Sequence, residues 1–209
     1  MSSLIIAIDG PAGSGKSTTA KAVAQKLGWS FLDTGAMYRA VTVEALRLGM
    51  DVADAEKMGE FAQTLEINTL PTVSVNGRDV TEEIRSDVAN LNVSVIASNP
   101  LVREAMVSRQ RDFAARQPVG TVVEGRDITT VVFPDATLKI YLTASLEERA
   151  SRRGEEGAES LARRDEVDST REASPLRQAP DAIVVDTTQK SVDDVVGEII
   201  QCLNNTASR

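Results

Sequence analysis

The octapeptide at residues 10–17, Gly-Pro-Ala-Gly-Ser-Gly-Lys-Ser, fits the pattern G-x-x-x-x-G-K-[ST] at every position. An apolar, β-branched run at residues 4–8 precedes it, and a helical pattern with an apolar face follows it. In such a setting the glycines let backbone N–H groups curl around an anion, and the helix N-terminus adds its positive dipole end. The segment therefore predicts a phosphate-binding loop (P-loop) and a nucleoside triphosphate as ligand.

Two side chains of this loop carry chemistry. Lys16 is placed to reach the β- and γ-phosphates, and the Ser17 hydroxyl is placed to ligate Mg²⁺. The alternative, an ordinary glycine-rich turn, requires every motif position to be filled by chance. We expect the triphosphate to be bound by Gly10, Pro11, Ala12, Gly13, Ser14, Gly15, Lys16, Ser17 and Thr18.

The amino-acid composition excludes several classes of function and partner. The chain of 209 residues has a formal net charge of −8, which argues against a nucleic-acid polymer as partner. It contains no histidine, so histidine bases, triads and metal sites are excluded, whereas phosphoryl transfer relies on positioning and electrostatics. Cys202 is the single cysteine, which excludes an intramolecular disulfide. With no secretory signal and no apolar run near the ~18 residues of a membrane span, we expect a cytoplasmic protein without a membrane partner.

The spacing of apolar runs predicts the fold. Runs at residues 119–123, 138–142 and 183–185, and a weaker one at 30–33, resemble the run at 4–8. Continuous apolar strands of this length are typical of a parallel sheet buried on both faces. Helical patterns lie between them, and the last one begins at Ser191 with an apolar stripe from Val192 to Leu203. The alternation predicts a three-layer α/β fold in one domain.

Two stretches depart from that alternation. Residues 67–80 are rich in β-forming residues, and Asn76-Gly77 is a strong hairpin signal, so we expect a small antiparallel insert. Residues 152–174 are densely charged. A charge run is usually a solvated helix face, but in a P-loop protein a late, arginine-bearing segment also suits a lid that covers phosphates.

Further motifs narrow the class of P-loop protein. The GTPase pattern Asn-Lys-x-Asp is absent. Residues 33–39 read Asp-Thr-Gly-Ala-Met-Tyr-Arg, residues 78–85 read Arg-Asp-Val-Thr-Glu-Glu-Ile-Arg, and residues 124–128 read Glu-Gly-Arg-Asp-Ile. Val102-Arg103-Glu104-Ala105 lies on a predicted helix between them. Together these motifs closely resemble the bacterial cytidylate kinase family of nucleoside monophosphate kinases, over essentially the whole chain from Leu4 to Leu203.

The resemblance implies a P-loop kinase fold with a parallel five-stranded core sheet, a monophosphate-binding insert with a small antiparallel sheet, and a helical lid. The expected parts are a core of residues 1–33, 99–149 and 176–209, a monophosphate-binding region of residues 34–98, and a lid of residues 150–175. The implied reaction is phosphorylation of CMP or dCMP by ATP with Mg²⁺. The implied oligomeric state is a monomer.

The resemblance also implies roles for individual residues of the site. The resemblance implies that Arg39, Arg126 and Arg171 contact the acceptor phosphate and, with Lys16, are catalytic. It implies cytosine recognition by Ser94, Arg103 and Asp127, a monophosphate site lined by Asp33 and Thr34, and ribose contacts from Arg164 and Asp168. The resemblance also implies that Arg149, Arg152 and Arg153 are lid residues near the ATP phosphates. The chemistry agrees, because a carboxylate suits the cytosine N4 donor and a guanidinium suits the N3 and O2 acceptors.

Two positions depart from the family pattern. Glu124 stands where Asp is frequent, and Thr129 stands where Gly is common in G-R-D-x-G-T. Glu124 retains the ability to orient Mg²⁺-bound water. Two readings compete with a role in the site: Arg126 and Asp127 as a plain ion pair, and Asp33 as a helix cap only.

Two other functions stay open from sequence. One is another small-molecule P-loop kinase, such as a UMP/CMP kinase of adenylate-kinase type or a shikimate-type kinase. The hairpin insert and the pair Arg103/Asp127 argue against it. The other is a regulator that uses ATP as a switch and transfers nothing, against which the predicted acceptor site argues.

Overall fold

The computed structural model describes residues 4–153, 157–171 and 174–207, without the side chains of Arg153, Arg164 and Ala207. The chain divides into two compact units. The first comprises residues 1–32 and 113–209, and the second comprises residues 33–112.

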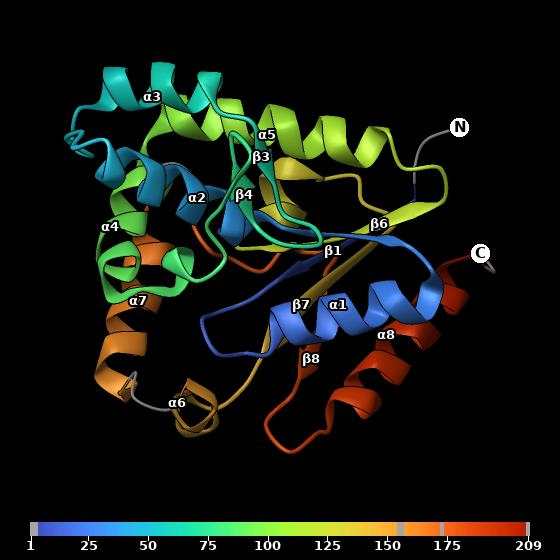
Figure 1. Cartoon of the computed structure of the whole chain (residues 1–209). Coiled ribbons are helices and arrows are strands. Elements are labelled where there is room, and N and C mark those ends of the chain that lie inside the picture. Colours follow the sequence, from blue (N-terminus) through green and yellow to red (C-terminus); the bar gives the residue numbers. More distant parts are fainter. Residues whose placement is uncertain (1–3, 154–156, 172–173, 208–209) are drawn as a thin grey trace. The chain divides into compact units, whose positions relative to one another are not determined.

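The first unit is built on a five-stranded sheet (Figure 1). Its strands are β1 (Leu4–Asp9), β2 (Ser30–Asp33), β6 (Gly120–Gly125), β7 (Leu138–Thr143) and β8 (Ile183–Asp186), in the order β2-β6-β1-β7-β8. β1 runs parallel to both β6 and β7, and β7 runs parallel to β8. The predicted parallel core sheet is confirmed, including the weak strand at residues 30–33.

Helices α1 (Lys16–Leu27) and α8 (Val192–Ala207) lie side by side on one face of this sheet (Figure 1). Their apolar residues join Ile6, Ile8 and Ile140 of the strands in one buried cluster. Ser191 precedes α8 as predicted, and its hydroxyl accepts a hydrogen bond from the backbone N–H of Asp194. The predicted stripe is buried at Val195, Val196 and Ile199, whereas Val192 in the first turn is 43% exposed.

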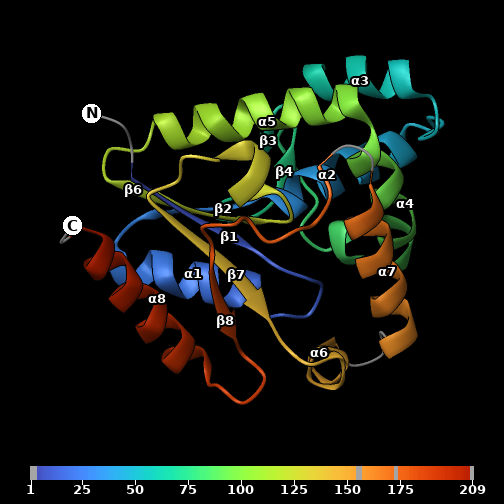
Figure 2. The ribbon, with the colours of Figure 1, turned by 180° about the vertical axis from the view of Figure 1, so that it is seen from behind.

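Two helices account for most of the charged stretch. They are α6 (Leu146–Arg153) and α7 (Ala158–Thr170), and Leu161 of α7 is fully buried. Figure 2 shows α6 beside the loop that joins β1 to α1. A short π-helical turn, η2 (Ile128–Val132), follows β6. None of the helices that the structure describes has both the length and the apolar character needed to cross a membrane.

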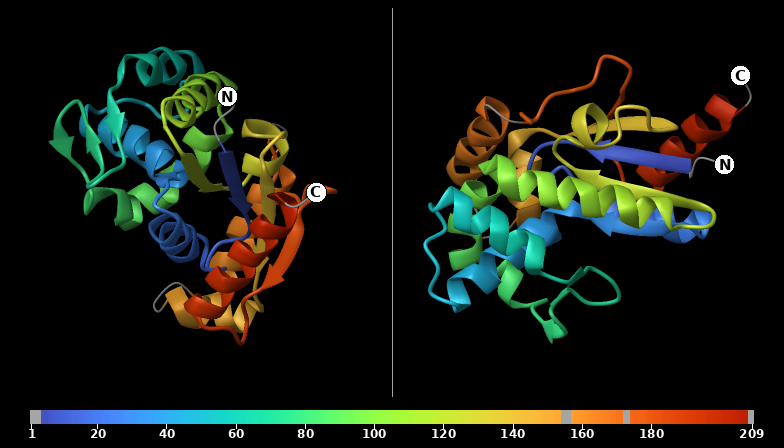
Figure 3. Two further views of the ribbon diagram at one scale, coloured as in Figure 1. Left: turned by 90° about the vertical axis from the view of Figure 1, so that its right-hand side faces the viewer. Right: turned by 90° about the horizontal axis from the view of Figure 1, so that it is seen from above.

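The second unit consists of helices and a small sheet (Figure 3). Its elements are α2 (Thr34–Arg47), α3 (Ala55–Thr64), β3 (Ile67–Asn68), β4 (Ser74–Val75), β5 (Arg78–Asp79), the 3₁₀ turn η1 (Glu83–Arg85), α4 (Asp87–Ser98) and α5 (Pro100–Ala115), whose last turn enters the first unit. The strands are antiparallel in the order β3-β4-β5. The predicted Asn76-Gly77 turn is present, with φ angles of 49° and 78°.

The apolar stripe of α5 is only partly as predicted. Val102 and Met106 are fully buried, but Leu101 is 40% exposed. Leu101 lies in the first turn of α5 and rests on the backbone of α3 at Gly59, where an added Cβ would stand 2.4 Å from the Cβ of Leu101. One side of Leu101 therefore packs on α3, and the other side faces solvent.

Candidate active site

The loop between β1 and α1 has the backbone of a phosphate cradle. Gly13 has a φ of 76°, and a Cβ added there would stand 2.8 Å from the carbonyl oxygen of Arg149. At Gly10 (φ 153°) an added Cβ would stand 2.1 Å from the carbonyl oxygen of Leu142. Only glycine fits either position, because the neighbouring groups are backbone that cannot move aside.

Lys16 and Ser17 open α1 at the end of the loop. The Lys16 side chain is held over the loop, where Nζ donates a hydrogen bond of 2.8 Å to the carbonyl oxygen of Pro11. The Ser17 hydroxyl donates a hydrogen bond of 2.5 Å to Oε1 of Glu124, which lies near the end of β6. A hydroxyl and a carboxylate side by side are hard oxygen ligands of the kind that Mg²⁺ prefers. These two residues fit a nucleotide-borne Mg²⁺.

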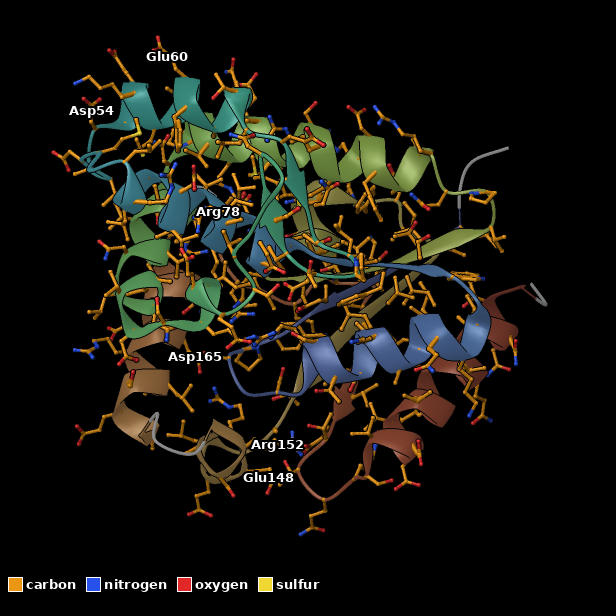
Figure 4. All side chains as sticks on the ribbon, in the orientation of Figure 1. Asp54, Glu60, Arg78, Glu148, Arg152 and Asp165 are labelled. Carbon is orange, nitrogen blue, oxygen red and sulfur yellow. The ribbon has the colours of Figure 1, made fainter. Side chains whose placement is uncertain are left out.

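Helices α6 and α7 contact the P-loop directly. Arg149 of α6 donates a hydrogen bond of 3.1 Å from Nη1 to the carbonyl oxygen of Ala12, and it forms an ion pair with Asp165 of α7. The Asp165 carboxylate in turn accepts a hydrogen bond of 3.2 Å from the backbone N–H of Ala12 (Figure 4). The Asp165 carboxylate therefore accepts a hydrogen bond from a P-loop N–H of the type that binds phosphate oxygens.

Arg152 is tied to the loop after β8. Its Nη1 donates a hydrogen bond of 2.9 Å to the hydroxyl of Thr187, and its Nη2 donates one of 2.7 Å to the carbonyl oxygen of that residue. The Thr187 hydroxyl lies 3.2 Å from the P-loop carbonyl oxygen of Ser14. Sequence reasoning missed Thr187 and Asp165. The available signal for Thr187 was its position just beyond the carboxyl end of a predicted strand, where ligands bind in open α/β sheets.

Arg126, Asp168 and Arg171 form one cluster. Nε of Arg126 donates a hydrogen bond of 2.8 Å to Oδ2 of Asp168, and Arg171 forms an ion pair with Oδ1 of the same carboxylate. Burial lowers the pKa of Arg126, but attraction to Asp168 outweighs burial, and the pKa lies above its ordinary value. The structure thus brings together three residues that span 45 positions of the sequence, from Arg126 to Arg171. The carboxylate partner of Arg126 is Asp168, on another element.

Asp127 follows Arg126 at the end of β6 and is 5% exposed. Its backbone carbonyl oxygen accepts hydrogen bonds from the N–H groups of Val131 (2.9 Å) and Val132 (3.2 Å), which closes the turn η2. The Asp127 main chain is therefore held in place by the turn that follows it.

The second unit carries the other predicted acceptor residues. Asp33 caps α2, because its carboxylate accepts a hydrogen bond of 2.9 Å from the N–H of Ala36, and Thr34 is buried. Nη1 of Arg39 donates hydrogen bonds to the carbonyl oxygen of Ile84 (2.9 Å) and to Oδ1 of Asn90 (2.8 Å). The structure thus shows Asp33 as a helix cap and anchors Arg39 against η1 and α4.

Arg103 and Ser94 lie on neighbouring helices of this unit. The Arg103 guanidinium lies 5.5 Å from the centre of the Tyr38 ring and donates a hydrogen bond of 3.1 Å to the carbonyl oxygen of Ala97. Ser94 is half-buried on α4. The predicted contacts from Arg153 and Arg164 rest on side chains outside the part of the chain that the structure describes.

Comparison with known proteins adds independent findings. A family model described as "Cytidylate kinase" matches residues 6–205. The chain is 47% identical to the cytidylate kinase of Geobacillus kaustophilus, covering 95% of this chain and 96% of that protein. It is 46% identical to the cytidylate kinase of Bacillus subtilis (96% of each chain) and 47% identical to that of Rhodococcus opacus (95% and 94%).

Solved structures agree at the level of the fold. TT1252 from Thermus thermophilus is similar with a TM-score of 0.55 at 18% identity, covering 98% of each chain. A shikimate kinase from Acinetobacter baumannii in complex with shikimate is similar with a TM-score of 0.51 at 15% identity, covering 97% of this chain and 94% of that one. At these identities the likeness supports a shared kinase fold and nothing more specific.

Proposed function

The chain belongs to the cytidylate kinase family, and from this premise we propose how its residues phosphorylate CMP. The enzyme transfers the γ-phosphoryl group of ATP to CMP, giving ADP and CDP. A phosphate oxygen of CMP attacks the γ-phosphorus, and the bond to the oxygen that bridges to the β-phosphate breaks. That nucleophile is mostly ionised at neutral pH, so the reaction needs no general base in a chain without histidine.

The observation that carries this assignment is the presence of a P-loop and of the pair Arg126/Arg171, joined through Asp168, in one compact unit. The donor and acceptor phosphates repel each other, and several fixed cations are needed to offset that repulsion. We assign Lys16 to the transferring phosphoryl group and the two arginines to the acceptor phosphate. The Asp168 carboxylate binds both guanidinium groups.

Ser17 and Glu124 are the residues that would hold Mg²⁺ with ATP. Among the described residues no group of three His, Cys, Asp or Glu side chains is arranged to bind a metal ion. One carboxylate and one hydroxyl fit the usual binding of Mg²⁺, which keeps several waters and takes its other ligands from phosphate oxygens. When bound, the ion neutralises charge on the β- and γ-phosphates. Glu124 and the Ser17 hydroxyl orient that side of the triphosphate.

For the acceptor we propose that Asp127 accepts from cytosine N4 and that Arg103 donates to N3 or O2, with Ser94 as a further contact. The burial of Asp127 (5% exposed) and of Arg103 (6% exposed) supports this, because a buried charge that reads a base is shielded from competing water. The remaining assignments are an acceptor-phosphate contact for Arg39, a monophosphate site at Asp33 and Thr34, ribose contacts for Arg164 and Asp168, and ATP-phosphate contacts for Arg149 and Arg153.

The same proposal covers the acceptor range, the location, the oligomeric state and the parts of the chain. We propose that dCMP is accepted beside CMP, and that the protein is a cytoplasmic monomer. We further propose a core of residues 1–33, 99–149 and 176–209, a monophosphate-binding region of residues 34–98, and a lid of residues 150–175 that closes over bound nucleotides. The ties of Arg149 and Asp165 to Ala12 support the lid assignment, because they place α6 and α7 at the phosphate cradle.

The test is ADP release from ATP with and without acceptor, using CMP, dCMP, UMP, AMP and shikimate in parallel. We expect turnover that depends on CMP and is weak or undetectable with AMP and shikimate. Release of ADP at one rate whatever the acceptor would instead indicate an ATP-driven regulator. A preference for shikimate or AMP would indicate a different small-molecule kinase.

A further inference from the structure

Asp9 is a buried carboxylate that the assignments above leave without a role. It is the last residue of β1, directly before Gly10 of the P-loop, and it is 0% exposed. In the sheet it stands between Gly125 at the end of β6 and Tyr141 of β7. Asp9 therefore lies where the strand that carries the P-loop and the strand that carries Arg126 and Asp127 end together.

The Asp9 carboxylate is bound by three donors of a single turn. Oδ1 accepts a hydrogen bond of 2.9 Å from the N–H of Ile128. Oδ2 accepts one of 2.7 Å from the N–H of Thr129 and one of 2.6 Å from the Thr129 hydroxyl. Ile128 and Thr129 are the two residues that immediately follow Arg126-Asp127.

Burying the Asp9 carboxylate destabilises the folded state unless all three of its hydrogen bonds are made. Burial raises the pKa of Asp9, and the hydrogen bonds from Thr129 and Ile128 act in the opposite direction. A buried carboxylate that loses one of several donors leaves an uncompensated group in the interior. The three hydrogen bonds therefore hold Asp9 and the turn after Asp127 in one position relative to each other.

We propose that Asp9 is a positioning residue for the acceptor substrate. It fastens the turn after Asp127 to the strand that carries the P-loop, and so holds Arg126 and Asp127 at a constant distance from Lys16. The inference rests on the proposed function, because it assigns a purpose to the fixed distance between the donor and acceptor groups. It acts through main-chain position, and Asp9 itself contacts no substrate.

Thr129 makes this fastening stronger in this chain. The family pattern often places glycine at this position, and glycine would supply the N–H but no hydroxyl. The Thr129 side chain adds a third hydrogen bond to the same carboxylate oxygen. The Thr129 hydroxyl can therefore be removed while Asp9 itself and the residues of the P-loop stay the same.

The test compares Asp9→Asn, Thr129→Val and Thr129→Ser with the parent in steady-state kinetics with CMP, UMP and ATP varied in turn. We expect Thr129→Val to raise the KM for CMP about three- to tenfold, the worth of one hydrogen bond. Asp9→Asn should raise the KM for CMP at least about tenfold, because the amide NH₂ of asparagine then faces a backbone N–H and both groups are donors. In both variants the CMP-to-UMP preference should shrink, and the KM for ATP should stay within about twofold. Thr129→Ser keeps the hydroxyl and should restore the parent values.

Ile199→Val is the matched control for stability. Ile199 is fully buried in α8, so the variant lowers the melting temperature without touching the turn at residues 127–132. It should leave the KM for CMP and the CMP-to-UMP preference unchanged. If Asp9→Asn does not fold, the comparison of Thr129→Val with Thr129→Ser decides alone. A Thr129→Val enzyme with the parent KM for CMP and the parent preference overturns the proposal.

Amide hydrogen exchange separates this inference from the function on which it rests. Measured without nucleotide, exchange across residues 127–132 should be faster in Thr129→Val than in Thr129→Ser. A parent protein that releases no ADP in response to CMP refutes the proposed function, whatever the exchange shows. An active parent with equal exchange and equal kinetics in the two Thr129 variants refutes only the positioning role.

Discussion

Nε of Arg126 and Oδ2 of Asp168 are joined by a hydrogen bond of 2.8 Å, although 42 positions separate the two residues in the sequence. Both side chains are largely removed from solvent, at 21% and 8% exposure. Arg171 binds the other oxygen of the same carboxylate. One carboxylate thus balances two guanidinium groups that we assign to the acceptor phosphate, so that their mutual repulsion does not spread them apart before CMP arrives.

The first prediction follows from that cluster. Asp168→Asn keeps the side-chain volume but leaves two shielded arginines facing each other, and breaking a buried pair costs about 3–5 kcal/mol. We expect a melting temperature lower by about 6–20 °C, since each kcal/mol corresponds to about 2–4 °C at this chain length. CMP should raise the melting temperature of the variant, because its phosphate replaces the negative charge lost between the two arginines.

Thermal unfolding with and without CMP measures both effects. Asp181→Asn is the matched control, because Asp181 pairs with Lys139 at the surface with its side chain 66% exposed. Exposed pairs contribute about 0–1 kcal/mol. Equal losses in Asp168→Asn and Asp181→Asn would show that the Arg126–Asp168–Arg171 cluster has no special weight.

The second prediction concerns Lys16. Lys16→Met keeps the apolar stem of a side chain that is 6% exposed, and it removes the cation that meets charge developing in the transition state. Loss of such a contact costs about 3 kcal/mol, which lowers kcat about a hundredfold or more. Lys21→Met on the exposed face of α1 is the control and should retain the parent rate. Single-turnover transfer from ATP to CMP is the measurement, and circular dichroism checks that each variant is folded.

The predictable part of the structure is the part that local pattern determines. Continuous apolar runs located the strands of the core sheet. Asn76-Gly77 located the hairpin of the small antiparallel sheet, because only residues that tolerate positive φ close such a turn. The P-loop was identified for the same reason. Its glycines at residues 10 and 13 have positive φ and face backbone that excludes a side chain.

The part that could not be predicted is pairing over distance. Nothing in the local pattern around Asp165 says that its carboxylate binds the N–H of Ala12, 153 positions away. Asp9 directly follows the apolar run at residues 4–8, and its three donors in the turn after Asp127 depend on the register of β1 with β6. The family resemblance named Arg126, Asp168 and Arg171 separately, and only the tertiary structure shows that they share one carboxylate.

The third prediction uses the close approach of the P-loop to α6. Gly13→Ala combines an unfavourable positive φ with a Cβ only 2.8 Å from the carbonyl oxygen of Arg149. We expect ATP binding to weaken at least about tenfold, because the loop must shift and its N–H groups lose their convergence. Calorimetric titration with ATP is the measurement.

Gly197→Ala is the matched glycine control. Gly197 lies inside α8, and an added Cβ there meets nothing within 4 Å. Alanine should stabilise that helix by about 0.5–1 kcal/mol and leave ATP binding unchanged. Equal ATP affinity in the two alanine variants would mean that the contact between Gly13 and Arg149 does not shape the cradle.

The fourth prediction concerns how the stability of the second unit depends on pH. Glu44 on α2 is buried between Arg47 and Arg78, and Arg78 joins it to the three-stranded sheet. The hydrogen bond from Arg47, supported by Arg78, outweighs burial and lowers the pKa of Glu44 from 4.5 to about 2. Because the folded pKa is the lower one, the stabilisation is complete above about pH 5 and is lost as the pH falls from 4.5 towards 2.

Glu44→Gln should therefore lower the free energy of unfolding by about 1–2 kcal/mol at pH 7, less than the full shift implies because Arg47 is half exposed. The difference from the parent should shrink as the pH is lowered towards 2. Urea unfolding across this range is the measurement, with Glu60→Gln on the exposed face of α3 as control (Figure 4). A difference that stays constant with pH would exclude the ionised carboxylate as its cause.

The last prediction concerns the choice of base. If Asp127 accepts from cytosine N4 and Arg103 donates to N3 or O2, uracil presents the opposite pattern, with O4 as an acceptor and N3–H as a donor. Buried groups that face the wrong partner cost more than a missing contact, and one good base contact discriminates by about 1–3 kcal/mol. Asp127→Ala should lower kcat/KM for CMP at least about tenfold and reduce the CMP-to-UMP ratio.

Steady-state kinetics with both acceptors measures this ratio, and Asp135→Ala in the exposed loop before β7 is the matched control. The competing reading gives Asp127 only a structural role beside Arg126, and it requires an equal loss with CMP and UMP. Because the carboxylate and the guanidinium of Arg103 act on different atoms of the base, Arg103→Met should also reduce the ratio. A folded Asp127→Ala enzyme with the parent CMP-to-UMP ratio would remove Asp127 from base recognition and leave that task to Arg103 and Ser94.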